Sequence, residues 1–337
     1  MCKDDHKCRA WISLESIGIQ ADGCLRDTTW LNTLKVPTSH SIFNSSIYID
    51  LPNEKLTAIK NVAHGTFGNI DLALYKLDSK QSEVYVKRPI IPGKNLIYEA
   101  CIQKLVGEQL SSIGFPTGAP KVLKILKLRD NSIAFAMEQI TGTTTLDKYL
   151  ESADVSTLSR IIIDCLIQLC GMLWYLDETL GINHRDLKPS NFLIYEHETP
   201  IRKVIVIENE IIEIESRYSL TFIDFGFSCL GSTETQISDL SLSNVYPKSD
   251  PCPKKGRDMY LFLAFLYIDY YSKLPANLIK LFESWLNVSG SKFFSLMKKD
   301  PNYCKKWLYF IVGNDNIKQF NCCPQKIMKD LLSLNSR

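Results

Sequence analysis

The spacing of apolar and polar residues divides the chain into a strand-rich part followed by a helical part. A helix is predicted over 95–110, where apolar positions repeat with helical spacing. Short runs rich in β-branched residues and bounded by glycine or polar turns predict strands near 57–62, 69–75, 83–88, 121–128 and 132–138. Helical patterns dominate after Thr144. Because strands and helices are segregated along the chain, we expect an α+β fold.

Two segments with unusual patterns add detail. Apolar and polar residues alternate over 203–215 on both sides of a polar turn, which predicts a β-hairpin. The most apolar stretch, 158–180, contains charged residues, among them Arg160 and Asp164. A membrane span requires about 20 nearly uncharged residues. We therefore predict a buried helix over this stretch and no membrane role.

The pattern also predicts how the chain divides into parts. Residues 1–50 carry scattered polar residues without a sustained period, and we interpret them as an extension with little regular structure. A small lobe is predicted over 51–140 and a larger helical lobe over 141–337, with the hairpin as an insertion near 196–219. Several aromatic residues after position 270 are expected in the core of the remaining helices: Trp285, Phe293, Phe294, Trp307 and Phe310.

Composition narrows the classes of function. The 337 residues are 45% hydrophobic and 23% charged, with a formal net charge of +2, so no strong field favours nucleic acid or an anionic membrane. The eleven cysteines form no regular framework. Neither Cys2 with Cys8 nor Cys322 with Cys323 has the two-residue spacing of a zinc site. The first ten residues are polar, unlike a signal peptide, and we expect an intracellular protein, cytoplasmic or nuclear.

One polar segment concentrates the groups that phosphoryl transfer requires. This run reads His184-Arg185-Asp186-Leu187-Lys188-Pro189-Ser190-Asn191. The reaction needs a carboxylate to orient the acceptor hydroxyl, a cation for the migrating phosphoryl group and oxygen ligands for Mg²⁺. Asp186, Lys188 and Asn191 supply these groups within six residues. Pro189 disfavours a plain helix here.

This run resembles the catalytic loop of eukaryotic-type Ser/Thr protein kinases, H-R-D-L-K-P-x-N. Downstream, Asp224-Phe225-Gly226 follows an apolar strand and resembles the D-F-G motif of that family. The resemblance implies a two-lobed protein-kinase-like fold with ATP between the lobes. It also implies Asp186 as catalytic base, Lys188 as the phosphoryl-stabilising cation, and Asn191 and Asp224 as Mg²⁺ ligands. Lysine at position 188 is typical of Ser/Thr kinases rather than of tyrosine or small-molecule kinases.

The resemblance extends to an ATP site in the predicted small lobe. The segment 63–70 resembles the Gly-rich loop G-x-G-x-x-G-x-V, with alanine in place of the first glycine. The positions expected to line the phosphates there are Ala63, Gly65, Phe67, Gly68 and Ile70. Lys87 resembles the V-A-I-K lysine that contacts the α- and β-phosphates. Its expected partner on the following helix is Glu99, with Glu108 as the alternative.

The segment 135–142 resembles the hinge that joins the two lobes of a kinase. In this interpretation Met137 guards the back of the ATP pocket. The backbone groups of Glu138 to Ile140 would bond adenine. Because backbone groups do the binding, the side chains here specify little.

The chain departs from the family pattern after the D-F-G motif. No A-P-E motif follows, and Val245-Tyr246-Pro247 stands about where it is expected. The separation of Asp186 from Asp224, 224 − 186 = 38 residues, is longer than usual in the family, and the predicted hairpin accounts for the excess. This layout is similar to that of haspin-type and some virus-encoded kinases. With an Ile/Lys/Asn-rich sequence, it suggests a viral or otherwise fast-evolving source, and a location in the host cell if the protein is virus-encoded.

Three features nearby keep two interpretations each. Asp258 either braces the catalytic-loop backbone or caps a helix. The basic residues Lys254, Lys255 and Arg257 either favour acidic substrates or form a solvated turn. The Ser/Thr-rich segment 227–248 is either phosphorylated for activation, with Arg185 holding the phosphate, or is a surface loop.

We therefore expect ATP- and Mg²⁺-dependent phosphorylation of Ser and Thr hydroxyls in protein substrates. The sequence does not identify the substrate or the oligomeric state, and no nucleic-acid or membrane partner is indicated. Ala63 and the missing A-P-E favour one alternative, a catalytically weak pseudokinase that acts as a binding or regulatory module. A small-molecule kinase with the same fold is a further alternative.

Overall fold

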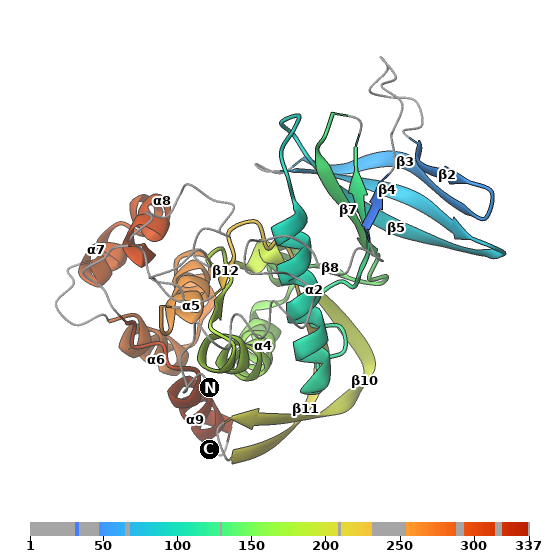
Figure 1. Cartoon of the computed structure of the whole chain (residues 1–337). Helices are drawn as coiled ribbons and strands as arrows, with labels where there is room; N and C mark the ends of the chain where they lie inside the picture. The colour runs from blue at the N-terminus through green and yellow to red at the C-terminus, as the bar shows by residue number, and fades with distance from the viewer. Residues whose placement is uncertain are drawn as a thin grey trace, which may run out of the picture. The chain divides into compact units, whose positions relative to one another are not determined.

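The structure is a computed structural model that describes residues 31–33, 47–64, 68–128, 130–207, 210–230, 254–287, 293–313 and 319–335. Two compact units divide the chain (Figure 1). The first unit comprises the described residues within Leu14–Gly107 and Ala119–Thr141. The second comprises those within Glu108–Gly118 and Gly142–Arg337.

The first unit is built on one twisted seven-stranded sheet with the order β1-β6-β7-β5-β4-β3-β2. Its strands are β1 (Leu31–Thr33), β2 (Ile47–Leu51), β3 (Glu54–His64), β4 (Gly68–Leu77), β5 (Lys80–Pro89), β6 (Val122–Lys127) and β7 (Ile133–Glu138). Only the β1–β6 pair among these is parallel. Helix α2 (Ile97–Ser112) follows β5. The predicted strands are confirmed in this unit, and the predicted helix is confirmed as α2, whose residues up to Gly107 belong to it.

Two strands lie where the sequence predicts an unstructured extension. Strand β1 pairs with β6, and β2 pairs with β3. Tyr48 and Ile49 of β2 are buried, and the Tyr48 hydroxyl donates to Asp71 Oδ2 at 2.6 Å. The prediction for 1–50 is therefore wrong in these two places. Neither run is long enough to show a period. Strand β1 also depends on a partner far along the chain, whereas β2 pairs with the strand that directly follows it.

The second unit is mainly helical. Its helices include α3 (Leu146–Ser152), α4 (Val155–Trp174), α5 (Arg257–Tyr270), α6 (Ala276–Leu286), α7 (Phe293–Lys299), α8 (Pro301–Val312) and α9 (Pro324–Asn335). Its strands are β8 (Thr144–Thr145), β9 (Ile182–Asn183), β10 (Phe192–Ile207), β11 (Glu210–Phe222) and β12 (Cys229–Leu230). Helix α5 is buried almost all round and forms the centre of the unit, as expected of a helix that is apolar on every face.

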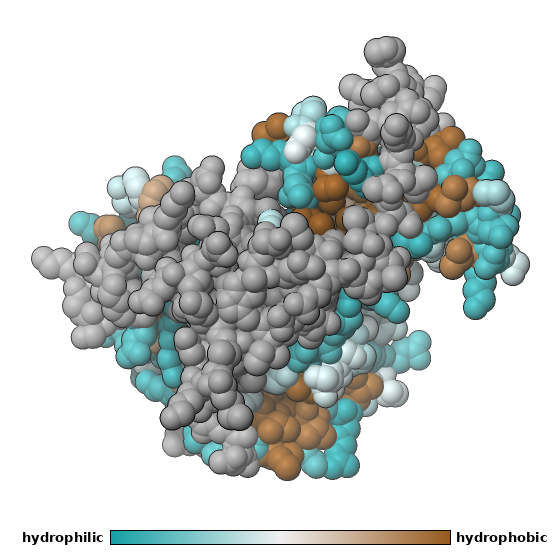
Figure 2. All heavy atoms as spheres, in the orientation of Figure 1, coloured by the Kyte–Doolittle hydropathy of each residue, from teal (hydrophilic) through white to brown (hydrophobic). Residues whose placement is uncertain are grey.

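The predicted hairpin is present and longer than the pattern indicated. Strands β10 and β11 pair from Phe192 with Phe222 to Ile207 with Glu210. One face of the hairpin packs on α4, where Ile205 lies so close to Gly171 that an added Cβ would come within 2.4 Å of Ile205 Cγ2. On the other face, Val204, Val206 and Ile211 are exposed, and apolar atoms gather over this part of the surface in Figure 2.

A buried lysine marks the centre of the contact between hairpin and helix. Lys203 donates to Gln168 Oε1 at 2.5 Å, to the Tyr218 carbonyl at 2.9 Å and to Ser219 Oγ at 3.1 Å. Burial lowers its pKa from 10.5 to about 8, against the opposing attraction of Asp164. The side chain is thus hydrogen-bonded, yet its charge is poorly solvated.

The apolar stretch predicted as a buried helix forms α4 and the single π-helical turn after it (Tyr175–Thr179). By length and composition alone, Val155–Asp177 could cross a membrane, with a mean hydropathy of 1.5 over its most apolar window. However, 61% of that window is buried inside the protein, and α4 packs against α9 and the hairpin. This environment is that of a core helix, whose apolar residues are mostly covered by the rest of the unit.

Among the described cysteines, several are free thiols, and Cys101, Cys165 and Cys170 are buried. Burial raises the pKa of Cys101 to about 12. Cys229 of β12 is disulfide-bonded, so the described chain does not consist of free thiols alone.

Candidate active site

The catalytic-loop residues follow the short strand β9 and lead into β10. Pro189 begins a single 3₁₀ turn that ends at Asn191, which agrees with the expectation that proline prevents a plain helix here. Arg185 has a left-handed backbone with φ of 65°. Non-glycine residues adopt this conformation at a cost of roughly 1–3 kcal/mol and persist in it only where the surroundings hold them.

Asp258, at the start of α5, supplies that hold. Its Oδ2 accepts the His184 backbone N–H at 2.6 Å, and its Oδ1 accepts the Arg185 N–H at 2.8 Å. The side chain is buried, and burial raises its pKa although both hydrogen bonds favour the carboxylate. Of the two interpretations from the sequence, bracing of the catalytic loop is confirmed.

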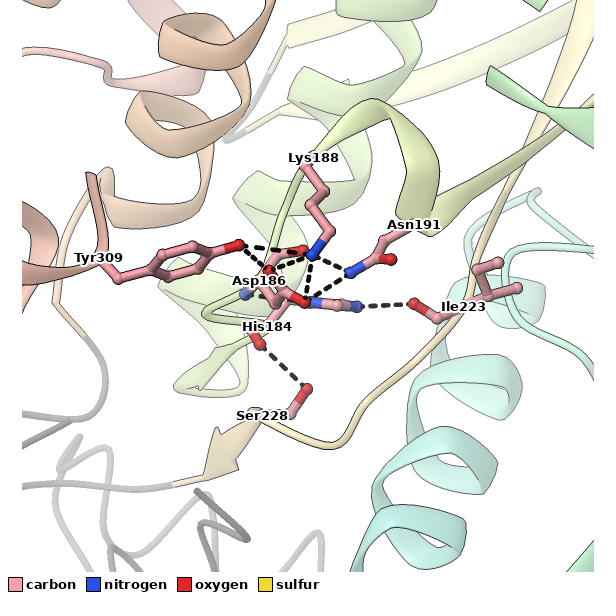
Figure 3. A network of polar contacts seen from close by, with 7 residues as sticks. All are labelled: His184, Asp186, Lys188, Asn191, Ile223, Ser228 and Tyr309. Atoms are coloured by element: carbon pink, nitrogen blue, oxygen red, sulfur yellow. Dashed lines mark hydrogen bonds and ion pairs between the residues drawn. The ribbon is translucent and has the colours of Figure 1, made fainter. Parts of the chain in front are cut away.

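The loop gathers three predicted residues at one point, drawn in Figure 3. The Lys188 Nζ lies 3.1 Å from Asp186 Oδ1 and 3.0 Å from Oδ2. The Asn191 Nδ2 donates to Asp186 Oδ2 and to its backbone carbonyl, both at 2.8 Å. Asp186 is 7% exposed, so its carboxylate lies at the edge of the interior. The arrangement fixes the carboxylate through two side chains from its own loop.

A fourth side chain reaches this carboxylate from far along the chain. Tyr309 of α8 donates its hydroxyl to Asp186 Oδ1, and Lys188 Nζ lies 3.4 Å from the same hydroxyl (Figure 3). Sequence reasoning did not find Tyr309. No motif marks it, and the aromatic residues beside it, Trp307 and Phe310, were expected in the core.

The structure corrects that expectation in part. Trp307 and Phe310 are 43% and 64% exposed, so the prediction is wrong for both, whereas Trp285 and Phe293 are buried as predicted. The buried face of α8 consists instead of Cys304, Leu308 and Val312. A helical period selects one face for the core, and residues at the wrong positions remain outside whatever their hydrophobicity.

Asp224 lies beside the catalytic loop. The preceding residue, Ile223, donates its N–H to the Asn191 carbonyl at 3.0 Å, and its own carbonyl lies 3.1 Å from His184 Nε2. Phe225 packs against the His184 ring at 5.0 Å between centroids. Like Arg185, Asp224 has a left-handed backbone with φ of 65°. Two strained residues thus lie at one site, which is where functional strain concentrates.

In the first unit, Lys87 of β5 forms an ion pair with Glu99 of α2. Both side chains are buried. The pairing confirms Glu99 rather than Glu108 as the partner. A buried pair of opposite charges is costly to desolvate, and removal of one partner leaves an uncompensated charge.

The predicted Gly-rich loop is described only in part. Ala63 of β3 pairs with Ile70 of β4, so strands flank the turn as expected. Gly65 and Phe67 lie outside the described residues. At Gly68, an added Cβ would come within 3.0 Å of the Arg88 carbonyl and 3.2 Å of Lys87 Cε. Glycine at this position therefore leaves room for the lysine side chain.

The predicted hinge segment begins within β7, which ends at Glu138, and continues into the residues after it. Met137 is buried, and the Gln103 amide lies 3.4 Å from its sulfur. The Glu138 N–H donates to the Lys121 carbonyl at 3.0 Å. This N–H is therefore not available to adenine.

The structure tests the interpretation of the basic residues after the D-F-G motif but not that of the Ser/Thr-rich segment. Lys254 and Arg257 are buried, and Lys254 Nζ donates to the Val312 carbonyl at 2.9 Å. For these two residues, both a solvated turn and a substrate contact are wrong; only Lys255 is exposed. Most of the Ser/Thr-rich segment, with Val245-Tyr246-Pro247, lies outside the described residues.

Within the described part of the chain, no group of three or more His, Cys, Asp or Glu side chains could hold a metal ion. The donor set expected for Mg²⁺ is smaller: one amide oxygen from Asn191 and one carboxylate from Asp224. It fits a cation that binds through one or two protein oxygens and takes its other ligands from water and phosphate.

Comparison with known proteins defines the class of fold. No family model matches the chain. Among solved structures, the crystal structure of the BubR1 kinase domain is similar, with a TM-score of 0.53 and 15% sequence identity over 97% of this chain and 92% of that one. An identity this low shows the fold alone. The chain therefore has a protein-kinase-like fold, with a β-sheet lobe and a helical lobe.

Proposed function

We propose that this chain is a protein kinase that transfers the γ-phosphoryl group of ATP to Ser and Thr hydroxyls of protein substrates. The observation that carries the proposal is the arrangement around Asp186. Its carboxylate is held by Lys188 and Asn191, and the loop that bears it is braced by Asp258. A phosphoryl-transfer site needs such positioning more than it needs covalent chemistry.

Each residue of the site has a role in this proposal. Asp186 orients the acceptor hydroxyl and accepts its proton, and Lys188 stabilises the negative charge on the migrating phosphoryl group. Asn191 and Asp224 hold Mg²⁺, which neutralises charge on the phosphates. Lys87, oriented by Glu99, binds the α- and β-phosphates.

A cavity beside the catalytic loop supports a polypeptide acceptor. It has a volume of about 430 Å³ and is bounded by Lys188, Pro189 and Ser190 on one side and by Asp147 and Glu151 of the α3 region on another. A segment of extended chain could place a side chain in this cavity next to the catalytic lysine. The cavity is lined by both acidic and basic side chains, among them Asp269, Lys273 and Lys305, so its charge favours neither sign.

The proposal is tested by measuring phosphoryl transfer from labelled ATP with Mg²⁺ to casein, to histone H1 and to the protein itself. Wild type is compared with Asp186→Asn and Asp224→Asn, and with Asp50→Asn as a matched surface control, since Asp50 is exposed and pairs with the exposed Lys55. We expect label on Ser or Thr in wild type and Asp50→Asn, and its loss in the two site variants. Equal label in all four would reveal a contaminating kinase and refute the proposal.

A pseudokinase is the second candidate, because Ala63 replaces the first glycine of the phosphate loop and a tyrosine already bonds to Asp186. In that case the protein binds nucleotide without turnover. Nucleotide binding by calorimetry together with no transfer in wild type would favour this candidate over the kinase.

A further inference from the structure

The Asp186 carboxylate has no hydrogen-bonding capacity left for a substrate. Oδ1 accepts from Lys188 at 3.1 Å and from the Tyr309 hydroxyl, and Oδ2 accepts from Lys188 at 3.0 Å and from Asn191 at 2.8 Å. Each carboxylate oxygen has two lone pairs in good position to accept. An acceptor hydroxyl can therefore bond to Asp186 only after one of these partners has left.

Tyr309 is the partner whose departure costs the site least. Lys188 and Asn191 belong to the same loop as Asp186, whereas Tyr309 lies 123 residues away on α8. It is also the one of the three that presents a neutral hydroxyl, the same group that Ser and Thr substrates present. Its O–H donates to the carboxylate in the way that a substrate hydroxyl must.

A turn of the Tyr309 side chain, rather than a movement of the whole helix, would separate its hydroxyl from Asp186. Both ends of α8 are held, because the Asp300 side chain accepts the Tyr303 N–H at 3.1 Å and Lys254 Nζ donates to the Val312 carbonyl at 2.9 Å. The Tyr309 ring lies beside two other aromatic rings, with its centroid 6.2 Å from that of Phe227 and 6.3 Å from that of Phe265. A change of its rotamer would vacate Asp186 without unfolding α8.

We propose that Tyr309 is an internal competitor for the phosphoryl-acceptor position. Its hydroxyl takes the place of the substrate hydroxyl on Asp186, so that only acceptors able to displace it are phosphorylated efficiently. This inference rests on the proposed kinase activity, and it adds a residue that selects among acceptors.

The decisive variants are Tyr309→Phe, which removes the hydroxyl, and Tyr309→Ala, which also removes the ring. Tyr303→Phe is the matched control: Tyr303 lies on the same helix and is 48% exposed. With casein and histone H1 as acceptors, we expect kcat/KM for the acceptor to rise about tenfold in both Tyr309 variants, the factor that corresponds to one hydrogen bond of about 1.4 kcal/mol. The rise should come mainly from a lower KM for the acceptor, with the KM for ATP unchanged, and Tyr303→Phe should match wild type.

Two results would overturn the proposal. A fall or no change in kcat/KM for the acceptor in both Tyr309 variants would mean that the tyrosine positions Asp186 or has no part in acceptor binding. Label on Tyr309 itself, formed at a rate independent of enzyme concentration, would make it an acceptor in cis rather than a competitor.

A measurement without turnover separates this inference from the proposed function. In protein labelled with 3-fluorotyrosine, the ¹⁹F signal of Tyr309 is identified by its absence in Tyr309→Phe. We expect that signal to shift in Asp186→Ala while the Tyr303 signal stays in place. An unmoved Tyr309 signal would refute the contact. A shifted signal in a protein without any transfer activity would keep the contact and refute the kinase.

Discussion

Substitution of Asp258 by asparagine tests whether this carboxylate holds the catalytic loop. The change preserves size but leaves a single carbonyl oxygen, and the amide NH₂ then faces one of two backbone donors. Those donors are the N–H groups of His184 and Arg185, now 2.6 and 2.8 Å from the carboxylate oxygens. One hydrogen bond is therefore lost, and one buried N–H loses its partner.

The magnitude follows from these two losses. A hydrogen bond to a charged group contributes about 1.5–3 kcal/mol, and a buried donor left without a partner costs about 1–3 kcal/mol. Because burial already raises the pKa of Asp258, the neutral asparagine recovers part of the cost of desolvating the charge. We expect the free energy of unfolding to fall by about 2 kcal/mol.

Activity should fall by a separate route. The left-handed backbone of Arg185 relaxes when its N–H is no longer held, and Asp186 is the next residue. A displacement of the catalytic group by about 1 Å can reduce turnover by about 100-fold. We expect kcat to fall at least tenfold (~1.4 kcal/mol) with little change in the KM for ATP.

The assays are urea unfolding and steady-state phosphoryl transfer on the same preparations. Asp177→Asn is the matched control, because Asp177 also accepts two hydrogen bonds, from Asn183 Nδ2 and from the Gly256 N–H, both at 3.0 Å. It should lose similar stability with a smaller loss of kcat. If Asp258→Asn is destabilised but retains the wild-type kcat, the catalytic loop does not depend on Asp258 and the reasoning fails.

Three further predictions concern the rest of the chain. The pKa of Lys203 is lowered from 10.5 to about 8, so between these pH values the unfolded chain binds more protons than the folded one. The free energy of unfolding of wild type, relative to that of Lys203→Met, should therefore rise by about 1–2 kcal/mol from pH 7 to 9.5. Urea unfolding at the two pH values would contradict this if the difference between the two proteins stayed the same. Gly171→Ala should lower the free energy of unfolding by about 1–3 kcal/mol because the new methyl group overlaps Ile205. In a double-mutant cycle, Ile205→Ala should lower the free energy of unfolding less in the Gly171→Ala background than in wild type. Lys87→Met leaves the buried Glu99 charge without its ion-pair partner, so we expect a loss of about 3–5 kcal/mol, and the double variant with Glu99→Leu should recover stability but not activity.

Local sequence patterns predicted most of the first unit. The runs that became β3, β4, β5, β6 and β7 carry strong strand signals between turn residues, and their bounds agree within a few residues. The two strands that were missed, β1 and β2, are short; β1 pairs with the distant β6, and β2 pairs with β3, the strand that follows it. A short run has too few residues for a period to appear, so its state depends on the edge that it can join.

The part of the candidate site whose residues lie close together in the sequence was predicted. Asp186, Lys188 and Asn191 lie within six consecutive residues, and the conformation of this loop brings their side chains together. Lys87 and Glu99 were matched because a strand and the following helix place their side chains within reach of one another.

Contacts between segments far apart in the sequence were decided only by the tertiary structure. The sequence left Asp258 with two possible roles, and packing of α5 beneath the catalytic loop selected one. Lys254 and Arg257 were expected at the surface because charge usually favours water, yet both are buried, Arg257 at the start of α5 and Lys254 just before it. Tyr309 had no signal at all, because a residue at this distance from Asp186 acquires its partner only when α8 packs on α5. Spacing in the chain determines which groups meet within an element, whereas burial of apolar faces determines which elements meet.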